Sequence, residues 1–384
     1  MLQEVAAARH VLIMCGSTTI DGYAFCLGLQ SLQLSYDARP DLRNRILSVT
    51  YLIRGSIFRS EYTTSSSGEV SLGIRPLGEL IDMYHAHEAS ERRDKVFALR
   101  GMSSDDSSAA HLLPNYDIPW EDLFRQLVEF LLGRQVSVEI LAHPEIAAIK
   151  SKGCIIGRVS SEGDPDRYDR QQVVITPKDV SGHMGPGRKW TLQASAKSIQ
   201  VGDLVCFLQG APKPTVIRPC KDHFYVIITA PSLGMENGSV GQQEQTIVSF
   251  QHDFLLVWAW ERFQGKLQDR EFETLINSPV PQHSNREMGG HSDKMTRLWN
   301  VALILEDAGE YEKAEERLRE AVESYERGFG KENLNTLIGV ERLALLYKKM
   351  KQWEKAEERL KQLIQTRNRC EGLTIQTRQA TWPT

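Results

Sequence analysis

The sequence predicts a multidomain protein with an α/β region, then a β-rich region, then a C-terminal α-helical region. Three observations predict this order. Residues 1–145 mix helical and strand patterns, residues 150–232 are rich in β-branched and aromatic residues, and the stretch EKAEERL occurs twice near the C-terminus. The length of 384 residues is typical of two or three domains.

The composition is that of an ordinary globular protein, with 41% hydrophobic and 25% charged residues. A formal net charge of −4 gives no electrostatic reason to expect a nucleic acid or an anionic membrane as a partner. The apolar runs are far shorter than the ~18 residues of a membrane-spanning helix, and the first residues show no signal-peptide pattern. The six cysteines include no C-x-x-C pair, so we expect free thiols, no bound metal and a cytoplasmic protein.

The N-terminal region opens on a predicted helix followed by a predicted buried strand. Leu2–Arg9 contains no glycine or proline, and Val11–Met14 is an unbroken apolar run. In an α/β domain such a helix lies between two parallel strands, because parallel strands need helical crossovers. No strand pattern precedes this helix. We therefore expect the chain to begin within a domain, as a gene-model fragment would.

A second helix is predicted within ASERRDKVFALRGMSSD, residues 89–105. Ser90 would cap this helix, and Val96 and Leu99 would face the core. The stretch LLPNYDIPWEDLFRQLVEFLL, residues 112–132, follows it and ends in the apolar spacing of another helix. Both stretches lie within the predicted α/β region.

Together with the opening stretch, these two blocks resemble the fungal heterokaryon-incompatibility (HET) domain. RDKVFALRG is similar to its RDKVYALLGL-like block, PNYDIPW to its PDYS-like block, and QEVAAARHVLIMCG to its R-x-W-x-x-QE-x-x-x-A block. The residues that match the motifs are Gln3, Glu4, Arg92, Arg93 and Asp94. The family's upstream W-x-D-x-x-CINQ block has no counterpart here. The resemblance therefore implies a partial, N-terminally truncated HET domain over residues 1–145.

The resemblance also names one candidate catalytic residue. HET domains are similar to Toll/interleukin-receptor (TIR) domains, some of which cleave NAD with a glutamate on a helix that feeds a buried strand. Glu4 occupies that place, where its carboxylate would stabilise an oxocarbenium-like centre while Arg92 or Arg93 attracts phosphates. The alternative is an exposed first-turn glutamate favoured by the helix dipole. Without the upstream half we expect no enzymatic activity and no cofactor, and NAD is a substrate only in the enzymatic alternative.

Residues 150–232 predict a small β-barrel or β-sandwich. Both alternating faces of its last apolar segment are hydrophobic, so this strand should be buried on two sides. A similar β-rich segment often follows the HET block in such proteins. For residues 233–291 we expect a helix around Phe254–Phe263 and then a linker. The β-rich segments are Gly202–Leu208, Pro214–Cys220 and His223–Ala230.

The C-terminal region, residues 292–384, carries the strongest internal signal. EKAEERL occupies Glu312–Leu318 and again Glu354–Leu360, an offset of 42 residues. Each unit predicts a helix, a short turn and a second helix, with alanines such as Ala314 and Ala356 at the helix crossings. The pattern resembles the tetratricopeptide repeat (TPR) in the spacing of kinesin-light-chain-like arrays.

Two repeats are expected over residues 292–330 and 334–370, followed by a stub of a third over residues 374–384 that Pro383 ends. About three repeats are usually required for stability, so the array looks cut short. The predicted helices are Lys294–Ala308, Tyr311–Arg327, Leu334–Met350 and Trp353–Arg369.

The first helix of each repeat lines a groove that binds peptides or a partner domain in such arrays. An asparagine and an arginine one repeat apart would bind a peptide backbone or a carboxylate there. The alternative is that these side chains are simply solvated, or that Trp299 and Leu345 cover the place of a third repeat. The groove positions are Trp299, Asn300, Leu303, Glu306, Glu341, Arg342, Leu345 and Lys348.

The combined prediction is a fungal protein of the incompatibility type, in which non-self recognition is coupled to programmed cell death. It would act in the cytoplasm through protein–protein interaction, with a protein or peptide in the repeat groove and neither nucleic acid nor membrane as partner. An oligomer is compatible with this pattern. Two alternatives stay open, an NAD-cleaving TIR-like effector that uses Glu4 and an inert HET remnant that serves only as a repeat interaction module.

Overall fold

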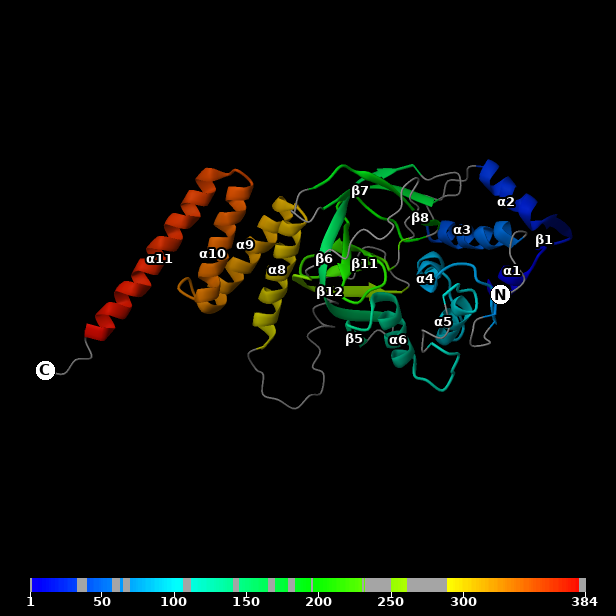
Figure 1. The fold of residues 1–384 in the computed structure, drawn as a ribbon, viewed down its shortest axis with the longest axis horizontal. Helices are drawn as coiled ribbons and strands as arrows, with labels where there is room; N and C mark the ends of the chain where they lie inside the picture. The colour runs from blue at the N-terminus through cyan, green and yellow to red at the C-terminus, as the bar shows by residue number, and fades with distance from the viewer. Residues whose placement is uncertain are drawn as a thin grey trace. The chain divides into compact units, whose positions relative to one another are not determined.

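The computed structural model divides the chain into two compact units (Figure 1). The first unit comprises Met1–Arg218, Tyr225–Gln251 and Leu256–Ile276, and the second comprises Pro219–Phe224, His252–Leu255 and Asn277–Thr384. The residues that the structure describes are 2–32, 40–56, 63–64, 70–105, 112–140, 145–164, 170–178, 184–194, 196–229, 231, 250–260 and 289–379.

Six helices and two short ribbons make up the N-terminal part of the first unit, within the residues that are described. Helix α6 shows why they form, since one face buries leucine and phenylalanine while Glu121 and Asp122 suit the positive end of the helix dipole. It ends at Gly133, where φ is +97° and a Cβ atom would lie 2.4 Å from the Gly210 oxygen. The helices are α1 (Leu2–Ala7), α2 (Gly22–Ser31), α3 (Pro40–Gly55), α4 (Leu77–Tyr84), α5 (Arg92–Arg100) and α6 (Trp120–Leu132).

The strand predicted at Val11–Met14 exists, but it is not buried. Strand β1 (Leu12–Cys15) pairs with β2 (Thr18–Asp21) in an antiparallel hairpin, and the Leu12 side chain is 64% exposed. The expectation of a buried parallel strand is therefore wrong. A turn at Gly16, with φ of +60°, folds the chain back at once, so the strand pairs with its neighbour in sequence. A second ribbon joins β3 (Thr63–Thr64) to β4 (Val70–Ser71).

Downstream of these helices the chain forms a sheet of eight strands. The sheet runs in the order β12-β11-β10-β9-β6-β7-β8, β5 pairs with β6, and β12 also pairs with β6. Strands β6, β9, β10, β11 and β12 therefore close into a ring, which is a small barrel. The strands are β5 (Ser137–Ile140), β6 (Ile146–Gly163), β7 (Arg170–Pro177), β8 (Arg188–Ala194), β9 (Leu204–Leu208), β10 (Thr215–Pro219), β11 (Phe224–Ile228) and β12 (His252–Ala259).

The apolar segment around Phe254 is strand β12, whereas the sequence predicted a helix there. The last four residues of this segment are all buried. Its apolar pattern therefore shows neither the two-residue period of a half-buried strand nor the 3.6-residue period of a helix. Its aromatic residues pack on α6, where the rings of Trp258 and Phe124 stack with centroids 5.2 Å apart. The strand completes the barrel and anchors α6 to it.

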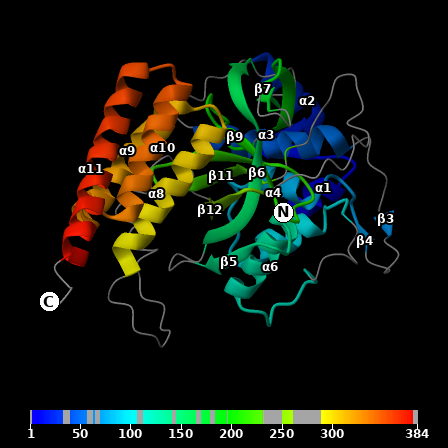
Figure 2. The same cartoon turned by 60° about the vertical axis from the view of Figure 1, so that its left-hand side comes forward.

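The four predicted repeat helices are confirmed, and they run side by side in Figure 2 from yellow to red. Ala314 and Ala356 are both buried, as expected at helix crossings. The predicted stub is not a separate helix, because the last helix continues without a break to Gln379. Gly372 lies within it and lowers helix propensity by only about 1 kcal/mol. The helices are α8 (Gly289–Asp307), α9 (Tyr311–Phe329), α10 (Leu334–Lys349) and α11 (Trp353–Gln379).

Candidate functional site

The structure brings the opening helix against the second block of the sequence analysis, residues 89–105. Gln3 on α1 donates a hydrogen bond from Nε2 to the Ala98 oxygen on α5, at 3.2 Å. A Cβ atom at Gly101 would lie 2.3 Å from this Gln3 nitrogen, so the contact requires glycine at that position. The two blocks, about ninety-five positions apart in the chain, are therefore packed together.

The second block in turn holds the third. Arg93 donates from Nη1 to the backbone oxygens of Tyr116 and Ile118, and from Nε to Glu91 at 2.8 Å. The Tyr116 hydroxyl donates to Asp94 Oδ1 at 2.5 Å. Residues that the resemblance names as a motif thus act as a clamp on the segment that leads into α6. The predicted cap at Ser90 is displaced by one residue, because the Glu91 side chain accepts from the Arg93 amide.

The other two motif residues lie apart from this clamp. Arg92 contacts Glu145 at 3.5 Å, where Lys95 also contributes an ammonium group at 3.6 Å. Glu4 is exposed on α1. The catalytic role of Glu4 and the phosphate-binding role of the arginines stay predictions.

A buried polar cluster on α4 was missed by the sequence analysis. All eight residues of α4 are buried, including two carboxylates. Asp82 accepts hydrogen bonds from the Thr229 amide and hydroxyl and from Gln193 Nε2, at 3.1 to 3.3 Å. A carboxylate that accepts this many bonds is well compensated for its burial. The cluster therefore ties α4 to strand β8 and to Thr229, the residue that follows β11.

Two basic groups complete the surroundings of Asp82. Lys197 is buried and donates from Nζ to the Ala259 oxygen at 2.7 Å. Burial lowers the pKa of Lys197, and the charge of Asp82 opposes that shift. Burial and then the Lys197 charge lower the pKa of His85 to about 4. The only sequence signal for this cluster is the spacing of Glu79, Asp82 and His85, which places them on one face of the helix.

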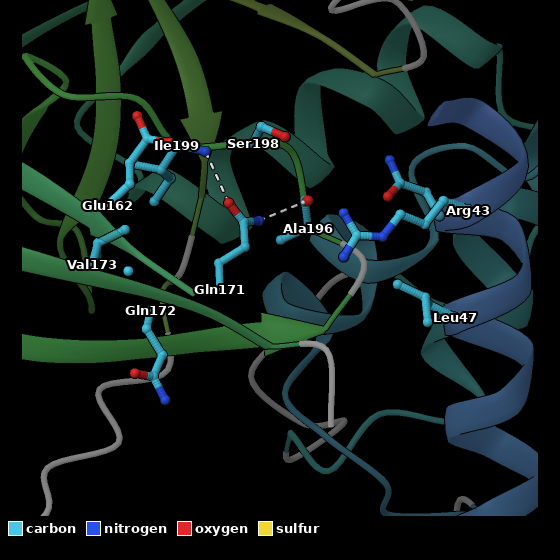
Figure 3. A pocket seen from close by; sticks show the side chains of 11 residues that line it. Arg43, Leu47, Glu162, Gln171, Gln172, Val173, Ala196, Ser198 and Ile199 are labelled. Carbon is cyan, nitrogen blue, oxygen red and sulfur yellow. Dashed lines mark hydrogen bonds between the residues drawn. The ribbon is translucent and has the colours of Figure 1, made fainter. Parts of the chain in front are cut away.

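A small polar cavity lies in the first unit between α3 and strands β6 and β7 (Figure 3). Its volume is about 210 Å³, and its wall includes Arg43, Asn44, Glu162 and Gln171. Gln171 lies at the centre of Figure 3 and bonds to the backbone of Ala196, Lys197 and Ile199 at 3.0 Å each. Its amide thus shapes the wall, and the cavity is lined by charges of both signs, from Arg43 and Glu162.

The predicted groove positions differ in how accessible they are. On α8, Trp299, Asn300 and Leu303 are half-buried, and Glu306 pairs with Lys349 of α10 at 2.5 Å. The Trp299 ring lies 3.4 Å from where a Cβ atom of Gly339 would be, so it packs between the helices. These four α8 residues therefore contribute mainly to the packing of the repeats.

On α10 the groove positions are open to solvent. Glu341, Leu345 and Lys348 are exposed, and Arg342 is half-buried. Two further apolar residues, Leu334 and Ile338, are exposed on the same side. The sequence analysis missed these two, although their spacing from Leu345 by seven and eleven residues is that of one helix face. We call Leu334, Ile338, Arg342, Leu345 and Lys348 the α10 face.

Charged contacts surround the start of the repeats within the second unit. Arg297 on α8 donates from Nε to Asp222 at 2.8 Å, and His223 contacts the other carboxylate oxygen at 3.0 Å. Burial alone would raise the pKa of Asp222, but the bonds and charges of His223 and Arg297 lower it to about 2. Lys221 also pairs with Glu320 at 2.8 Å, and His252 with Asp307 at 3.1 Å.

None of the described helices is both long and apolar enough to cross a membrane. Among the described residues, no group of histidine, cysteine, aspartate and glutamate side chains is placed to hold a metal ion.

Comparison with known proteins identifies one region. Residues 294–369 match the family described as tetratricopeptide repeat, and this range spans the four helices α8 to α11. No curated protein and no solved structure matches the chain. The matched residues form two helix–turn–helix units, and Ala314 and Ala356 are buried within them. The C-terminal part of this chain is therefore a tetratricopeptide repeat region.

Proposed function

We propose that this chain binds a protein or peptide partner through the α10 face. Tetratricopeptide repeats are protein-interaction modules, and the first helix of each repeat lines their groove. The observation that supports this choice is that Leu345 is 43% exposed and lies between two basic residues. Large apolar side chains flanked by charge are typical of interaction surfaces.

The chemistry of the α10 face favours a particular class of partner. Leu334, Ile338 and Leu345 form an apolar row that an amphipathic segment can cover. Arg342 and Lys348 stand three residues to either side of Leu345, and they outnumber the one exposed carboxylate on this side of the helix, Glu341. A carboxylate on the partner would satisfy them. The expected partner is an acidic peptide segment with two or three apolar anchors.

Selection of a displayed peptide library on the full-length chain tests this proposal. Peptides that bind should be enriched in acidic and large apolar residues, and fluorescence anisotropy should give their affinities. Leu345→Glu and Arg342→Glu should each weaken binding by about tenfold or more. Leu113→Glu is the matched control, because Leu113 is an exposed leucine that lies outside the repeats. Equal binding by all the variants would contradict the proposal.

We also propose that this chain acts in non-self recognition of the heterokaryon-incompatibility type, in the cytoplasm of a fungal cell. In this proposal the repeats bind the partner and the N-terminal part transmits the signal. What supports it is the packing of the three HET-like blocks, in which Gln3 bonds to Ala98 and Asp94 to Tyr116. A role in programmed cell death follows from the resemblance alone. The two alternatives, an NAD-cleaving effector that uses Glu4 and an inert module with interacting repeats, make different predictions.

Inducible expression in a filamentous fungus, read by a vital dye and by cellular NAD, separates these functions. If the chain transmits a death signal, cells should die, and Gly101→Val should weaken the signal by displacing the Gln3 side chain from Ala98. Death that also requires Glu4 and is preceded by loss of NAD would favour the enzymatic alternative. Survival of cells that express stable, folded protein would favour the interaction module.

A further inference from the structure

The exposed face of α11 corresponds, residue by residue, to the face of α9 that packs against α10. The 42-residue offset places Glu357, Leu360 and Ile364 of α11 at the positions of three α9 residues. Their counterparts on α9 are Glu315, Leu318 and Val322.

In the first repeat this face is covered. The Tyr347 hydroxyl of α10 donates to Glu315 at 3.0 Å, and Leu318 and Val322 are buried. The backbone of α10 comes so near that a Cβ atom at Gly339 would lie 2.5 Å from Val322 Cγ2. The pattern of a carboxylate and two aliphatic residues is thus used to hold a helix.

In the second repeat the same pattern is open. The Leu360 side chain is 43% exposed, Ile364 is 57% exposed, and Glu357 is on the surface. Trp353, 60% exposed, extends the apolar row by two helical turns toward the start of α11. A row of three large exposed apolar side chains on one helix favours coverage by another protein surface.

One position at which the two repeats differ indicates which partner covers the exposed face of α11. The next position of this face is Tyr325 in α9, which is buried, but Arg367 in α11, which is exposed. The outer face of α11 therefore carries a carboxylate near one end and a guanidinium near the other. Such a face is complementary to itself when two copies lie antiparallel.

We propose that this chain forms a two-fold homodimer in which α11 packs antiparallel on α11 of a second copy. In an antiparallel pair centred on residue 362, Leu360 faces the partner's Ile364. With the same centre, Glu357 faces the partner's Arg367. Each of these contacts then occurs twice, as a two-fold interface requires. The Glu357 carboxylate bonds to Lys361 at 2.6 Å in the single chain, and both side chains are solvated enough to rearrange.

The proposal is independent of the α10 face, which stays open for a partner. A single helix pair buries less area than the roughly 800 Å² per partner of a stable complex, so the dimer should dissociate in the micromolar range. Homodimerisation would also place two recognition faces in one particle. Binding to a partner that is itself dimeric would then gain from effective concentration.

Sedimentation velocity of the full-length chain from about 1 to 300 µM tests the proposal. We expect the wild type to shift from monomer to dimer across this range, and Leu360→Glu with Ile364→Glu to stay monomeric. Circular dichroism should confirm that this variant keeps its helices, since both residues are exposed. The control Leu345→Glu changes an equally exposed leucine on α10 and should leave the dimer intact.

A charge exchange identifies the second copy as the occupant. Glu357→Arg alone and Arg367→Glu alone should each raise the dimer dissociation constant about tenfold, because each places like charges together. The double variant should restore it to near the wild-type value. A wild type that stays monomeric up to 300 µM would overturn the proposal, as would a dimer that survives Leu360→Glu with Ile364→Glu. Failure of the double variant to restore the dimer would overturn the antiparallel arrangement.

Discussion

The two compact units of this protein are stabilised by contacts of different range. In the first unit the Asp82 cluster joins residues 147 positions apart, Asp82 to Thr229. In the second unit the hydrogen bond between Tyr347 and Glu315 joins neighbouring helices only 32 positions apart. The structure of the repeats can therefore be predicted from local sequence patterns. The barrel and the burial of α4 depend on contacts between residues far apart in the chain, which local patterns do not predict.

The same difference appears within the repeat region. The identical heptapeptides at Glu312–Leu318 and Glu354–Leu360 both form the start of a helix. The leucine that ends the first is 1% exposed, whereas the leucine that ends the second is 43% exposed. Identical residues make identical helices, but the neighbouring helix decides how much of each is buried.

The largest expected effect is on the long-range cluster of the first unit. Asp82→Ala removes the acceptor of Thr229 and Gln193 and the countercharge of Lys197, and should destabilise this unit by ~3–5 kcal/mol. Hydrogen exchange of α4 and β11 measures the loss. Glu121→Ala, an exposed carboxylate on α6, is the control and should change stability by under about 0.5 kcal/mol. A small effect of Asp82→Ala would show that the cluster contributes little.

The repeated heptapeptide offers a matched pair of truncations. Leu318→Ala should cost ~2–5 kcal/mol, because its side chain is buried between helices. Leu360→Ala should cost under about 1 kcal/mol at a protein concentration low enough to keep the chain monomeric. Urea unfolding followed by circular dichroism measures both. Equal costs would mean that the two helices are buried to the same extent in solution.

Enlargement of the small residues at helix crossings tests how closely the repeats pack. Ala314→Leu and Ala356→Leu should each overpack a crossing and lower stability by ~1–3 kcal/mol. The control is Lys313→Leu, one position away on the exposed side of α9. Thermal melts give the comparison, and a neutral result at both alanines would contradict their placement.

The smallest expected effect is the acid sensitivity of the second unit. The pKa of Asp222 is lowered to about 2 from an ordinary value of 3.8, so its ionised form stabilises the fold. This contribution, at most about 2 kcal/mol, is complete above pH 4 and is lost as the pH falls through about 2.

Asp222→Asn should remove this part of the pH dependence while leaving stability at pH 1.5 nearly unchanged. Hydrogen exchange of α8, which carries Arg297, measures the effect at a series of acid pH values. The same acid profile in the wild type and in Asp222→Asn would rule out Asp222 as its source.

Sequence reasoning reached the candidate surfaces only in part. It named Arg342, Leu345 and Lys348, because the groove positions of a repeat follow from its register. It missed Leu334 and Ile338, since an apolar residue on a helix is normally assigned to the core. The α11 face was missed for the same reason, because Leu360 sits in a pattern that buries Leu318.

Local residue patterns were enough to establish mixed α/β content ahead of a C-terminal helical region, the four repeat helices and the burial of Ala314 and Ala356. These features depend on helix periodicity and on an exact internal repeat, which a single sequence displays in full. Three others were decided only by tertiary structure: β1 is exposed, the segment around Phe254 is a strand, and Asp82 is a buried anchor. In each case the outcome depends on which distant residues cover a segment, and apolar runs and lone carboxylates carry no information about their distant neighbours.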